Sequence, residues 1–265
     1  MSYADVGGLR IWYEEHGAGK PLVLLHGEYG STETFAPVRP ALATRRRLIA
    51  VDLQGHGRTA DVDRPLRYES MADDVAALLR HLGLPRADVL GYSLGGGAAL
   101  RTAIQHPDLV RRLVLVSTPF RRRGWYPETL AAMSAHDERV AQRMRGTPLH
   151  ERYARVAPRP QDWQALWARG GELLRRDYDW SAEVAALPMP VLLVFADADE
   201  IPVSHAAEFF GLLGGGRRDA GGDGTGRPAS RLAVLPGLTH YDVLTSPALP
   251  AAVLPFLTHP ARAPG

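Results

Sequence analysis

Residues 87–100 read ADVLGYSLGGGAAL, an apolar run that ends in a glycine-rich turn and continues as a stretch of small residues. The turn has the pattern Gly-x-Ser-x-Gly, with Gly91, Ser93 and Gly95 at its fixed positions. Glycine is needed on both sides, because any side chain there would collide with the neighbouring strand or helix. The pattern predicts a buried strand, a strained turn that lifts the Ser93 hydroxyl clear of the sheet, and a helix from Gly95.

Other apolar runs of strand length lie on both sides of this turn. Most lack polar alternation and are rich in Val, Leu and Ile, as strands covered by helices on both faces tend to be. They are RIWYEEHG at 10–17, which we expect at the sheet edge, PLVLLH at 21–26, RLIAVD at 47–52, RRLVLVS at 111–117, MPVLLVFA at 189–196 and RLAVLP at 231–236. Helical patterns separate them at 35–43, 70–82, 95–106, 203–213 and 248–257. The alternation predicts an α/β fold with a mostly parallel central β-sheet flanked by helices.

The alternation breaks between Pro119 and Pro188, where the sequence shows no convincing strand. This stretch reads as several short helices punctuated by prolines. Its tryptophans are Trp125, Trp163, Trp167 and Trp180. We interpret residues 119–187 as a helical cap inserted into an α/β core that is formed by residues 1–118 and 188–265.

A second irregular stretch, GGGRRDAGGDGTGRPAS at 214–230, is polar and rich in glycine. Its composition imitates a phosphate-binding loop, but no strand leads into it and no Gly-Lys-Ser/Thr follows. We therefore expect a mobile surface loop.

A serine hydroxyl is a poor nucleophile without a general base and a third group that orients the base. Of the ten histidines, His240 follows a late strand and a Pro-Gly turn, which places it on the carboxyl edge of the sheet within reach of Ser93. The others lie near helix ends, on polar helix stretches or beside glycines, where surface or loop-bracing roles are expected. The strand at 189–196 runs into DADEIP, in which Asp199 lies far enough beyond the strand to reach His240. Asp197 is the alternative acid, although it is better suited to closing the turn through its own backbone.

These features together resemble the alpha/beta-hydrolase fold superfamily, in the group that includes serine carboxylesterases, cofactor-free haloperoxidases (perhydrolases) and carbon–carbon bond hydrolases. The segments that carry the resemblance are, in order, YEEHGAGKPLVLLHG, DLQGHGRT, GYSLGGGAALRTAIQHPDLVRRLVLVS, FADADEIP and LPGLTHYDVL. The resemblance implies a catalytic triad of Ser93, Asp199 as the acid and His240 as the base. It also implies that the backbone N–H groups of Glu28 and Leu94 form the oxyanion hole. Leu94 stands at the start of a helix, whose dipole favours an anion beside Ser93.

Glu28 departs from the family pattern, which often has a small or apolar residue at this position. An ionised carboxylate about 5 Å from the oxyanion would repel it by roughly 3 kcal/mol at an effective dielectric near 20. That repulsion nearly cancels the roughly 3 to 4 kcal/mol that one oxyanion-hole donor contributes. We therefore expect the side chain to point away and to pair with an arginine, first of all Arg58. The alternatives are a buried protonated acid, a contact with a substrate cation or hydroxyl, and a proton donor in chemistry other than ester hydrolysis.

Composition limits the other partners. The chain of 265 residues is 45% hydrophobic and 23% charged, which suffices for a full core. Its net charge of +2 is spread along the chain, and the short arginine runs at 45–47 and 121–123 lack the interleaved aromatic residues of a nucleic-acid surface. No His/Asp cluster has metal-ligand spacing, and the lack of cysteine excludes thiol nucleophiles and disulfides. Because no segment reads as a secretory signal or as a span of roughly 18 apolar residues, we expect a cytoplasmic protein that acts without a metal, cofactor, nucleic-acid or membrane partner.

The expected activity is hydrolysis of a small-molecule substrate, namely a small to medium apolar carboxylic ester or lactone, through an acyl-enzyme on Ser93. Aromatic residues near the site are the candidate substrate contacts, although the same residues could merely pack the cap onto the sheet. They are Tyr29, Trp125, Trp163 and Trp167. The alternatives are a carbon–carbon bond hydrolase or perhydrolase with the same triad, and a non-hydrolytic lyase, cyclase or ligand-binding member of the fold.

Overall fold

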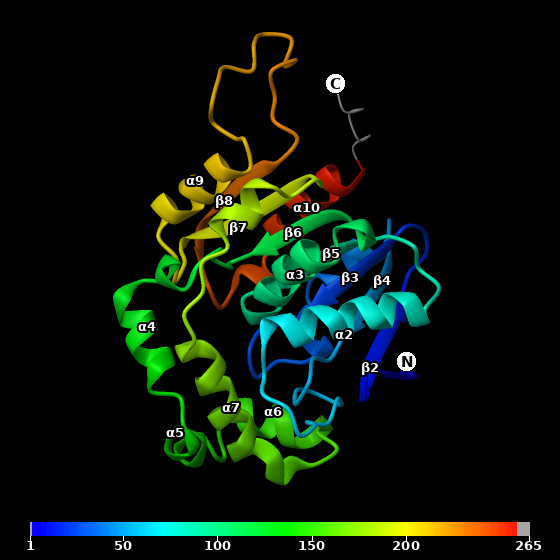
Figure 1. Ribbon diagram of the computed structural model, residues 1–265, viewed down its shortest axis with the longest axis vertical. Coiled ribbons are helices and arrows are strands. Elements are labelled where there is room, and N and C mark those ends of the chain that lie inside the picture. Colours follow the sequence, from blue (N-terminus) through cyan, green and yellow to red (C-terminus); the bar gives the residue numbers. More distant parts are fainter. Residues whose placement is uncertain (1, 259–265) are drawn as a thin grey trace.

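The computed structural model describes residues 2–258 and shows one twisted sheet with helices on both of its faces (Figure 1). The sheet is 8-stranded, with the order β1-β2-β4-β3-β5-β6-β7-β8. The strands are β1 (Ser2–Val6), β2 (Leu9–His16), β3 (Pro21–Leu25), β4 (Arg47–Val51), β5 (Ala87–Tyr92), β6 (Val110–Val116), β7 (Val191–Ala198) and β8 (Arg231–Thr239). β2 pairs antiparallel with β1 and β4, whereas all other neighbouring strands are parallel. The prediction of a mostly parallel sheet is confirmed.

The N-terminal edge of the sheet differs from the prediction. We expected the strand at 10–17 to be the edge, but β2 lies between β1 and β4. The edge strand is β1, in which Ala4 is the buried residue and pairs with Ile11 of β2. β1 was missed because its sequence, SYADV, is short and half polar, so that it lacks the apolar run that marks the inner strands.

The flanking helices bury apolar residues on the two faces of the sheet. They are α1 (Arg39–Ala43), α2 (Tyr68–His81), α3 (Leu94–Gln105), α9 (Val203–Leu212) and α10 (Ala248–Thr258). Residues from α2, α3 and α9 join one hydrophobic cluster, whereas residues from α1 and α10 join the other. Within β3, Val23 and Leu25 belong to the first cluster and Leu22 and Leu24 to the second. Because such a strand is covered on both faces, its sequence is apolar throughout.

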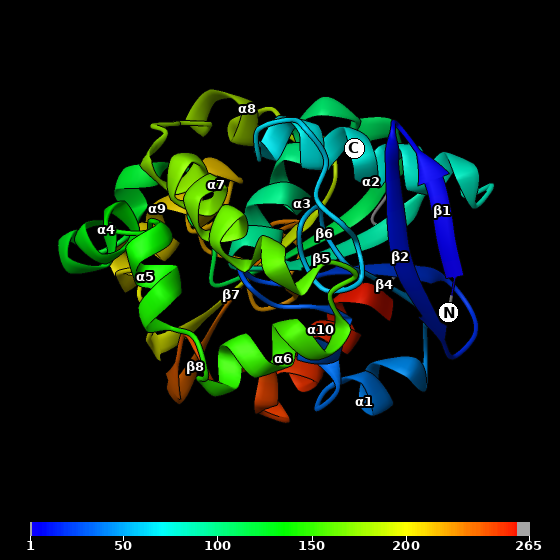
Figure 2. The same cartoon turned by 90° about the horizontal axis from the view of Figure 1, so that it is seen from below.

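A group of helices lies between β6 and β7. It consists of α4 (Pro127–Ser134), α5 (Glu138–Arg143), α6 (Pro148–Val156), α7 (Trp163–Arg175) and α8 (Ser181–Ala185), and we call it the intervening helices. Short 3-10 turns occur here and elsewhere, at Thr32–Phe35, Pro107–Leu109, Arg122–Gly124, Pro160–Asp162 and Val243–Thr245. Local signals start two of these helices, since Asp137 caps α5 and Thr147 caps α6 through their side chains. Seen from below, α5, α6 and α7 lie on the viewer's side of the sheet (Figure 2).

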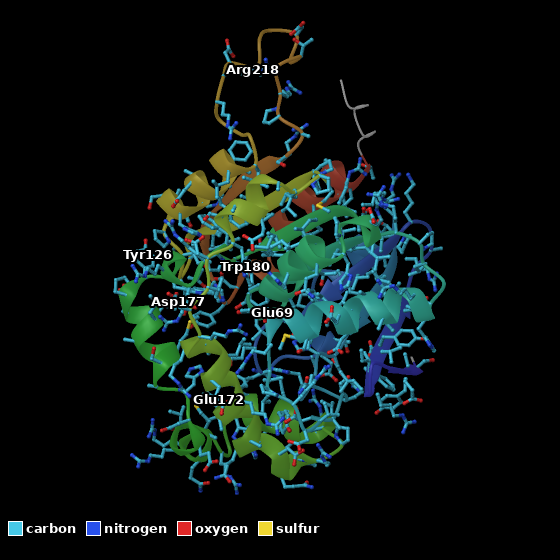
Figure 3. All side chains as sticks on the ribbon, in the orientation of Figure 1. Glu69, Tyr126, Glu172, Asp177, Trp180 and Arg218 are labelled. Atoms are coloured by element: carbon cyan, nitrogen blue, oxygen red, sulfur yellow. The ribbon has the colours of Figure 1, made fainter. Side chains whose placement is uncertain are left out.

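The stretch at 214–230 contains neither helix nor strand and extends from the body at the end opposite α4–α7 (Figure 1). Its residue Arg218 lies far from Trp180, which is labelled near the centre of the molecule (Figure 3). The prediction of a surface loop agrees with this position. Within residues 2–258, no helix is both long and apolar enough to cross a membrane.

Candidate active site

Ser93 occupies the turn between β5 and α3. Its backbone angles are φ 53° and ψ −120°, a conformation that residues with side chains rarely adopt. A Cβ at Gly95 would overlap the carbonyl oxygens of Leu25 and His26, and a Cβ at Gly91 would overlap the carbonyl oxygen of Gly95. The two glycines therefore allow β3, β5 and α3 to approach closely while Ser93 stays strained and raised.

His240 and Asp199 continue a line of hydrogen bonds that begins at Ser93. The Ser93 Oγ atom lies 3.1 Å from His240 Nε2, and His240 Nδ1 lies 2.8 Å from Asp199 Oδ1. Asp199 follows β7 and His240 follows β8, so that both side chains lie at the carboxyl ends of parallel strands. The imidazole and the carboxylate are buried. In this arrangement a neutral imidazole can take the serine proton while the carboxylate holds its Nδ1–H.

Donors from three segments fix the Asp199 carboxylate. Its Oδ1 atom also accepts the Glu200 N–H at 2.8 Å, while Oδ2 accepts the Ala196 N–H at 3.1 Å and the Ser117 hydroxyl at 2.6 Å. Ser117 is buried at the end of β6 and has a positive φ of 51°. This contact could not be predicted from the sequence, because a serine after an apolar strand is common and its partner lies 82 positions further along the chain.

The two acidic neighbours of Asp199 have other partners. Asp197 is exposed and accepts the N–H of Leu238 at 3.2 Å, and backbone donors, that of Gly237 first, hold its pKa below the ordinary value. Asp197 thus ties β7 to β8. The Glu200 carboxylate lies 3.8 Å from His240 Nε2 and accepts the hydroxyl of Tyr241.

Leu94 follows Ser93 directly in the chain, and the loop that carries Glu28 comes close to Ser93. Leu94 begins α3, and the first N–H groups of a helix have no acceptor within the helix. Gly27 brings the other loop close, since a Cβ on it would be 3.4 Å from Ser93 Cβ. Among the hydrogen bonds of residues 2–258, neither the N–H of Glu28 nor that of Leu94 donates to a protein acceptor. Two N–H groups without a protein acceptor are what the predicted oxyanion hole requires, and the dipole of α3 would favour an anion beside Ser93.

Comparison with known families agrees with this geometry. The family model described as alpha/beta hydrolase fold matches residues 20–203, a span that includes the turn at Ser93 and the acid Asp199. The chain belongs to the alpha/beta hydrolase fold family.

Several relatives and fold neighbours of this alpha/beta hydrolase are hydrolases. A 2-hydroxymuconate semialdehyde hydrolase from Pseudomonas sp. (strain CF600) is 38% identical over 115 residues, which are 42% of this chain and 41% of that protein. An sn-1-specific diacylglycerol lipase from Xenopus laevis is 36% identical over 126 residues, 46% of this chain and 40% of the lipase. The match therefore spans less than half the length of these curated relatives. The crystal structure of E-2-(acetamidomethylene)succinate hydrolase has a TM-score of 0.75 and 25% identity, and the match covers 97% of this chain and 98% of that one.

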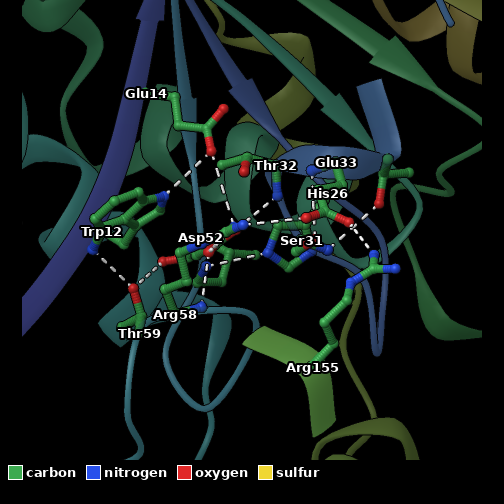
Figure 4. Close-up of polar contacts among 12 residues, drawn as sticks. Trp12, Glu14, His26, Ser31, Thr32, Glu33, Asp52, Arg58, Thr59 and Arg155 are labelled. Atoms are coloured by element: carbon green, nitrogen blue, oxygen red, sulfur yellow. Dashed lines mark hydrogen bonds and ion pairs between the residues drawn. The ribbon is translucent and has the colours of Figure 1, made fainter. Parts of the chain in front are cut away.

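His26 braces the loop that carries Glu28 in this alpha/beta hydrolase. Its Nδ1 atom lies 2.7 Å from the Gly27 carbonyl oxygen, and its Nε2 atom accepts the Leu53 N–H at 3.1 Å (Figure 4). These two bonds require the neutral ring with the proton on Nδ1. Burial lowers the pKa of His26 to about 3, which keeps the ring neutral. The loop-bracing role expected for a histidine beside glycine agrees with this geometry.

Asp52 fixes the same loop from the end of β4. It accepts the N–H of Thr32 at 2.6 Å and that of Arg58 at 2.7 Å, and burial raises its pKa to about 6. The Arg58 guanidinium donates to Glu33 at 3.0 Å, and Arg155 of α6 donates to the other oxygen of Glu33 at 2.6 Å (Figure 4). This chain of ion pairs connects the intervening helices to the core.

The prediction that Glu28 pairs with Arg58 is wrong. Arg58 is held by Glu33, as above, and its other nitrogen lies 3.7 Å from Asp52. The loop turns at Tyr29, which has a φ of 56°, and the Glu28 side chain contacts the intervening helices instead. The Glu28 Oε2 atom lies 3.7 Å from Nδ1 of His136, in the turn between α4 and α5. His136 was missed because nothing in its local sequence sets it apart from a surface histidine.

The predicted aromatic residues occupy three kinds of position. Tyr29 and Trp167 stack with ring centroids 4.1 Å apart, and Trp125 meets the His240 ring edge-on at 5.6 Å. Trp163 is only 1% exposed and donates its indole N–H to the Ala141 carbonyl at 2.9 Å. The structure thus brings Trp125 to the base and Tyr29 with Trp167 above the Glu28 loop, whereas Trp163 packs inside the intervening helices.

A cavity of about 220 Å³ lies between α2 and the segment that joins α7 to α8. Its lining residues are Tyr68, Glu69, Leu173, Arg176, Asp177, Tyr178, Asp179 and Trp180. Figure 3 labels Glu69, Asp177 and Trp180 in this region. Within residues 2–258, no three His, Asp or Glu side chains are placed so that they could hold a metal ion.

Proposed function

We propose that this alpha/beta hydrolase cleaves a small to medium apolar carboxylic ester or lactone through an acyl-enzyme on Ser93. The observation that supports the proposal is the line of hydrogen bonds from Ser93 through His240 to Asp199, with distances of 3.1 Å and 2.8 Å. The N–H groups of Glu28 and Leu94, which we assign to the oxyanion hole, donate to no protein acceptor among residues 2–258. A nucleophile, a base, an orienting acid and an oxyanion hole are the parts that acyl transfer requires.

In the proposed mechanism, His240 takes the proton of Ser93 as Oγ bonds to the carbonyl carbon of the substrate. The N–H groups of Glu28 and Leu94 hold the oxygen anion of the tetrahedral intermediate. His240 then gives its proton to the leaving oxygen as the carbon–oxygen bond breaks, and the alcohol departs. Water, activated by His240, attacks the acyl-enzyme in the same way and releases the acid. Asp199 keeps the proton on Nδ1, so that Nε2 faces Ser93 with its lone pair.

We assign residues 119–187 in this proposal to a cap over a core of residues 1–118 and 188–265, of which 259–265 lie outside the described part of the chain. The contacts of α6 and α7 with the loop after β3 support this division. Tyr29, Trp125 and Trp167 would contact an apolar small-molecule substrate. A cytoplasmic location, and action without a nucleic-acid or membrane partner, belong to the same proposal.

Hydrolysis of a carbon–carbon bond beside a ketone is the second candidate. It is favoured by the similarity to 2-hydroxymuconate semialdehyde hydrolase and by a carboxylate, that of Glu28, directly next to the oxyanion loop. The same serine and histidine would serve, but the leaving group would be a carbon that needs a proton.

Intact-protein mass spectrometry after exposure to a fluorophosphonate tests the serine, with Ser93→Ala as the control. We expect a single adduct that is absent from Ser93→Ala, together with turnover of p-nitrophenyl acetate and butyrate. A folded protein without an adduct would contradict the serine mechanism. An adduct on Ser93 without turnover of any ester or lactone would contradict the ester assignment and favour the second candidate.

A further inference from the structure

Glu200 places a second carboxylate against the general base. Its Oε2 atom lies 3.8 Å from Nε2 of His240, the same nitrogen that lies 3.1 Å from the Ser93 Oγ atom. Asp199 bonds to the opposite nitrogen, Nδ1. The proposed mechanism uses Ser93, His240 and Asp199 and gives Glu200 no task. Yet Glu200 faces the nitrogen that exchanges protons with the substrate, so that its carboxylate belongs to the site.

Three contacts fix Glu200 in this place. Its N–H donates to Asp199 Oδ1 at 2.8 Å, its carbonyl oxygen accepts the Tyr126 N–H at 3.1 Å, and its Oε1 atom accepts the Tyr241 hydroxyl. The bond to the carboxylate raises the pKa of Tyr241 to about 12. The backbone is thus tied to the triad and to the residue before α4, while Oε2 is left to face His240.

The charge of Glu200 is not neutralised by an arginine or a lysine. Within residues 2–258 its one ion-pair partner is His240, and a general base must be neutral to accept the serine proton. By contrast, Glu33 in the loop after β3 is held by both Arg58 and Arg155. The Glu200 side chain is 25% exposed, so that part of it remains open to solvent. The site therefore carries a negative charge beside the atom that serves the substrate.

Aromatic rings surround the same histidine. The rings of Trp125 and Tyr241 each lie 5.6 Å from that of His240, and Tyr241 is 75% exposed. A carboxylate beside aromatic rings is a combination that binds ammonium groups, because both the charge and the ring faces attract a cation. A neutral hydroxyl would only replace the hydrogen bond that water makes with an open carboxylate. An anionic group would be repelled.

The chemistry of the reaction decides which half of the substrate lies here. In the proposed mechanism His240 gives its proton to the leaving oxygen, which must then lie about 3 Å from Nε2. Because Glu200 Oε2 lies 3.8 Å from the same nitrogen, the leaving oxygen and Oε2 are at most about 7 Å apart. Two methylene groups place an ammonium nitrogen about 4 Å from the leaving oxygen. Such a cation can therefore contact the carboxylate.

We propose that Glu200 is a specificity-determining residue that binds a cation in the leaving alcohol, so that the enzyme prefers esters of amino alcohols with an apolar acyl half. The inference rests on the proposed function, because it names the alcohol half of the proposed ester. The bonds that form and break are those of the proposed mechanism. The acyl group passes to Ser93 Oγ, and the amino alcohol leaves with the proton that His240 took from the serine.

The experiment compares butyrylcholine with 3,3-dimethylbutyl butyrate, in which carbon replaces the quaternary nitrogen and the shape is kept. Acid release is followed by titration at constant pH. We expect wild-type kcat/KM to favour butyrylcholine about tenfold or more at low ionic strength. In Glu200→Gln this ratio should fall about tenfold or more, since the amide keeps an acceptor for Tyr241 but loses the charge. Added salt should lower the wild-type ratio and leave the Glu200→Gln ratio unchanged.

Asp197→Asn is the matched control, because it removes one negative charge three positions away, from an exposed carboxylate that bonds to the β8 backbone. Its ratio of kcat/KM values should equal that of the wild type. A merely structural role of Glu200 would lower both kcat/KM values and leave their ratio unchanged. Should Glu200→Gln turn over neither ester, calorimetric binding of both esters to Ser93→Ala, with and without Glu200→Gln, supplies the ratio.

The two proposals fail in different ways. If Ser93 takes up fluorophosphonate but the wild type does not prefer butyrylcholine, or Glu200→Gln keeps the preference, the role of Glu200 is refuted while the serine mechanism stands. An equal fall of the ratio in Asp197→Asn also refutes it, since net charge rather than position would then decide. Absence of both labelling and turnover refutes the proposed function itself.

Discussion

Replacing Asp199 by asparagine is expected to lower kcat/KM for p-nitrophenyl butyrate about 10³-fold. Both oxygens of the carboxylate accept donors. These donors are His240 and the Glu200 N–H on Oδ1, with Ser117 and the Ala196 N–H on Oδ2. Asparagine keeps the shape of the side chain but replaces one carboxylate oxygen by an NH₂ group. Because protein donors face both oxygen positions, this NH₂ group faces other donors whichever way the amide points.

Either orientation slows the reaction. If the NH₂ group faces His240, Nδ1 must accept, the ring proton moves to Nε2, and the ring can no longer take the proton of Ser93. If the amide oxygen faces His240, the tautomer is kept but the imidazolium loses its counter-charge. That attraction is about 4 kcal/mol for unit charges about 4 Å apart at an effective dielectric near 20. Since each 1.36 kcal/mol is a factor of ten in rate, the loss is about 10³, near the roughly 10⁴ known for this change in a serine protease.

Steady-state kinetics of wild type, Asp199→Asn and Asp197→Asn provide the assay, with thermal unfolding to show that each variant is folded. Asp197 is the matched control, because it lies two positions away, is exposed and bonds to the β8 backbone rather than to His240. We expect Asp197→Asn to stay within about twofold of wild type. A loss below tenfold in Asp199→Asn, or a loss of 10² in Asp197→Asn, would refute the assignment of the acid.

Ser117→Ala removes the hydroxyl that donates to the Asp199 carboxylate at 2.6 Å. Losing this hydrogen bond, which is worth about 1 to 2 kcal/mol, should lower kcat roughly 5- to 30-fold at constant KM in the same assay. An unchanged kcat would show that the hydrogen bond does not position Asp199. The second prediction concerns His26, whose pKa is lowered from 6.5 to about 3 by burial. Between pH 6.5 and pH 3 the unfolded chain therefore binds more protons than the folded chain. The free energy of unfolding falls as the pH falls through this range. Urea unfolding from pH 7 to 4 should show that His26→Gln, which can keep both hydrogen bonds, loses about 1.4 kcal/mol less per pH unit than wild type below pH 6.5; equal slopes would contradict the buried neutral ring. Gly95→Ala places a Cβ against two backbone carbonyl oxygens and should lower the free energy of unfolding by about 3 kcal/mol or more. Gly211→Ala on α9 is the control, because its Cβ would enter open space and the change should be neutral or slightly stabilising. Equal melting temperatures of the two variants would contradict the close packing at Ser93.

The sequence predicted the features that depend on local patterns. The strand-to-helix turn at Ser93 could be predicted because its two glycines, Gly91 and Gly95, each lie only two positions from the serine. The inner strands could be read because burial on both faces makes them apolar throughout. Ser117 and His136 could not be found in this way, because their roles come from partners 82 and 108 positions away, Asp199 and Glu28. Such pairs depend on how loops from different strands meet, which no local pattern encodes.

The prediction that Glu28 pairs with Arg58 was wrong for the same reason. The correct contacts show that the backbone and the side chain of Glu28 have different roles. Two core residues fix the loop around Glu28. His26 donates a hydrogen bond to the Gly27 carbonyl, and Asp52 accepts one from the Thr32 N–H. Neither bond involves the side chain at position 28. The N–H of Glu28 is therefore held in place by the core whatever side chain the residue carries.

The Glu28 side chain contacts the intervening helices instead. A Cβ at position 170 would lie 2.6 Å from the Glu28 carboxylate, so that the carboxylate would have to shift. The Glu28 carboxylate is directed toward His136 and α7, where it lies 3.7 Å from the imidazole of His136. The backbone of this loop can thus serve the chemistry proposed for the site while the side chain at position 28 packs against α7.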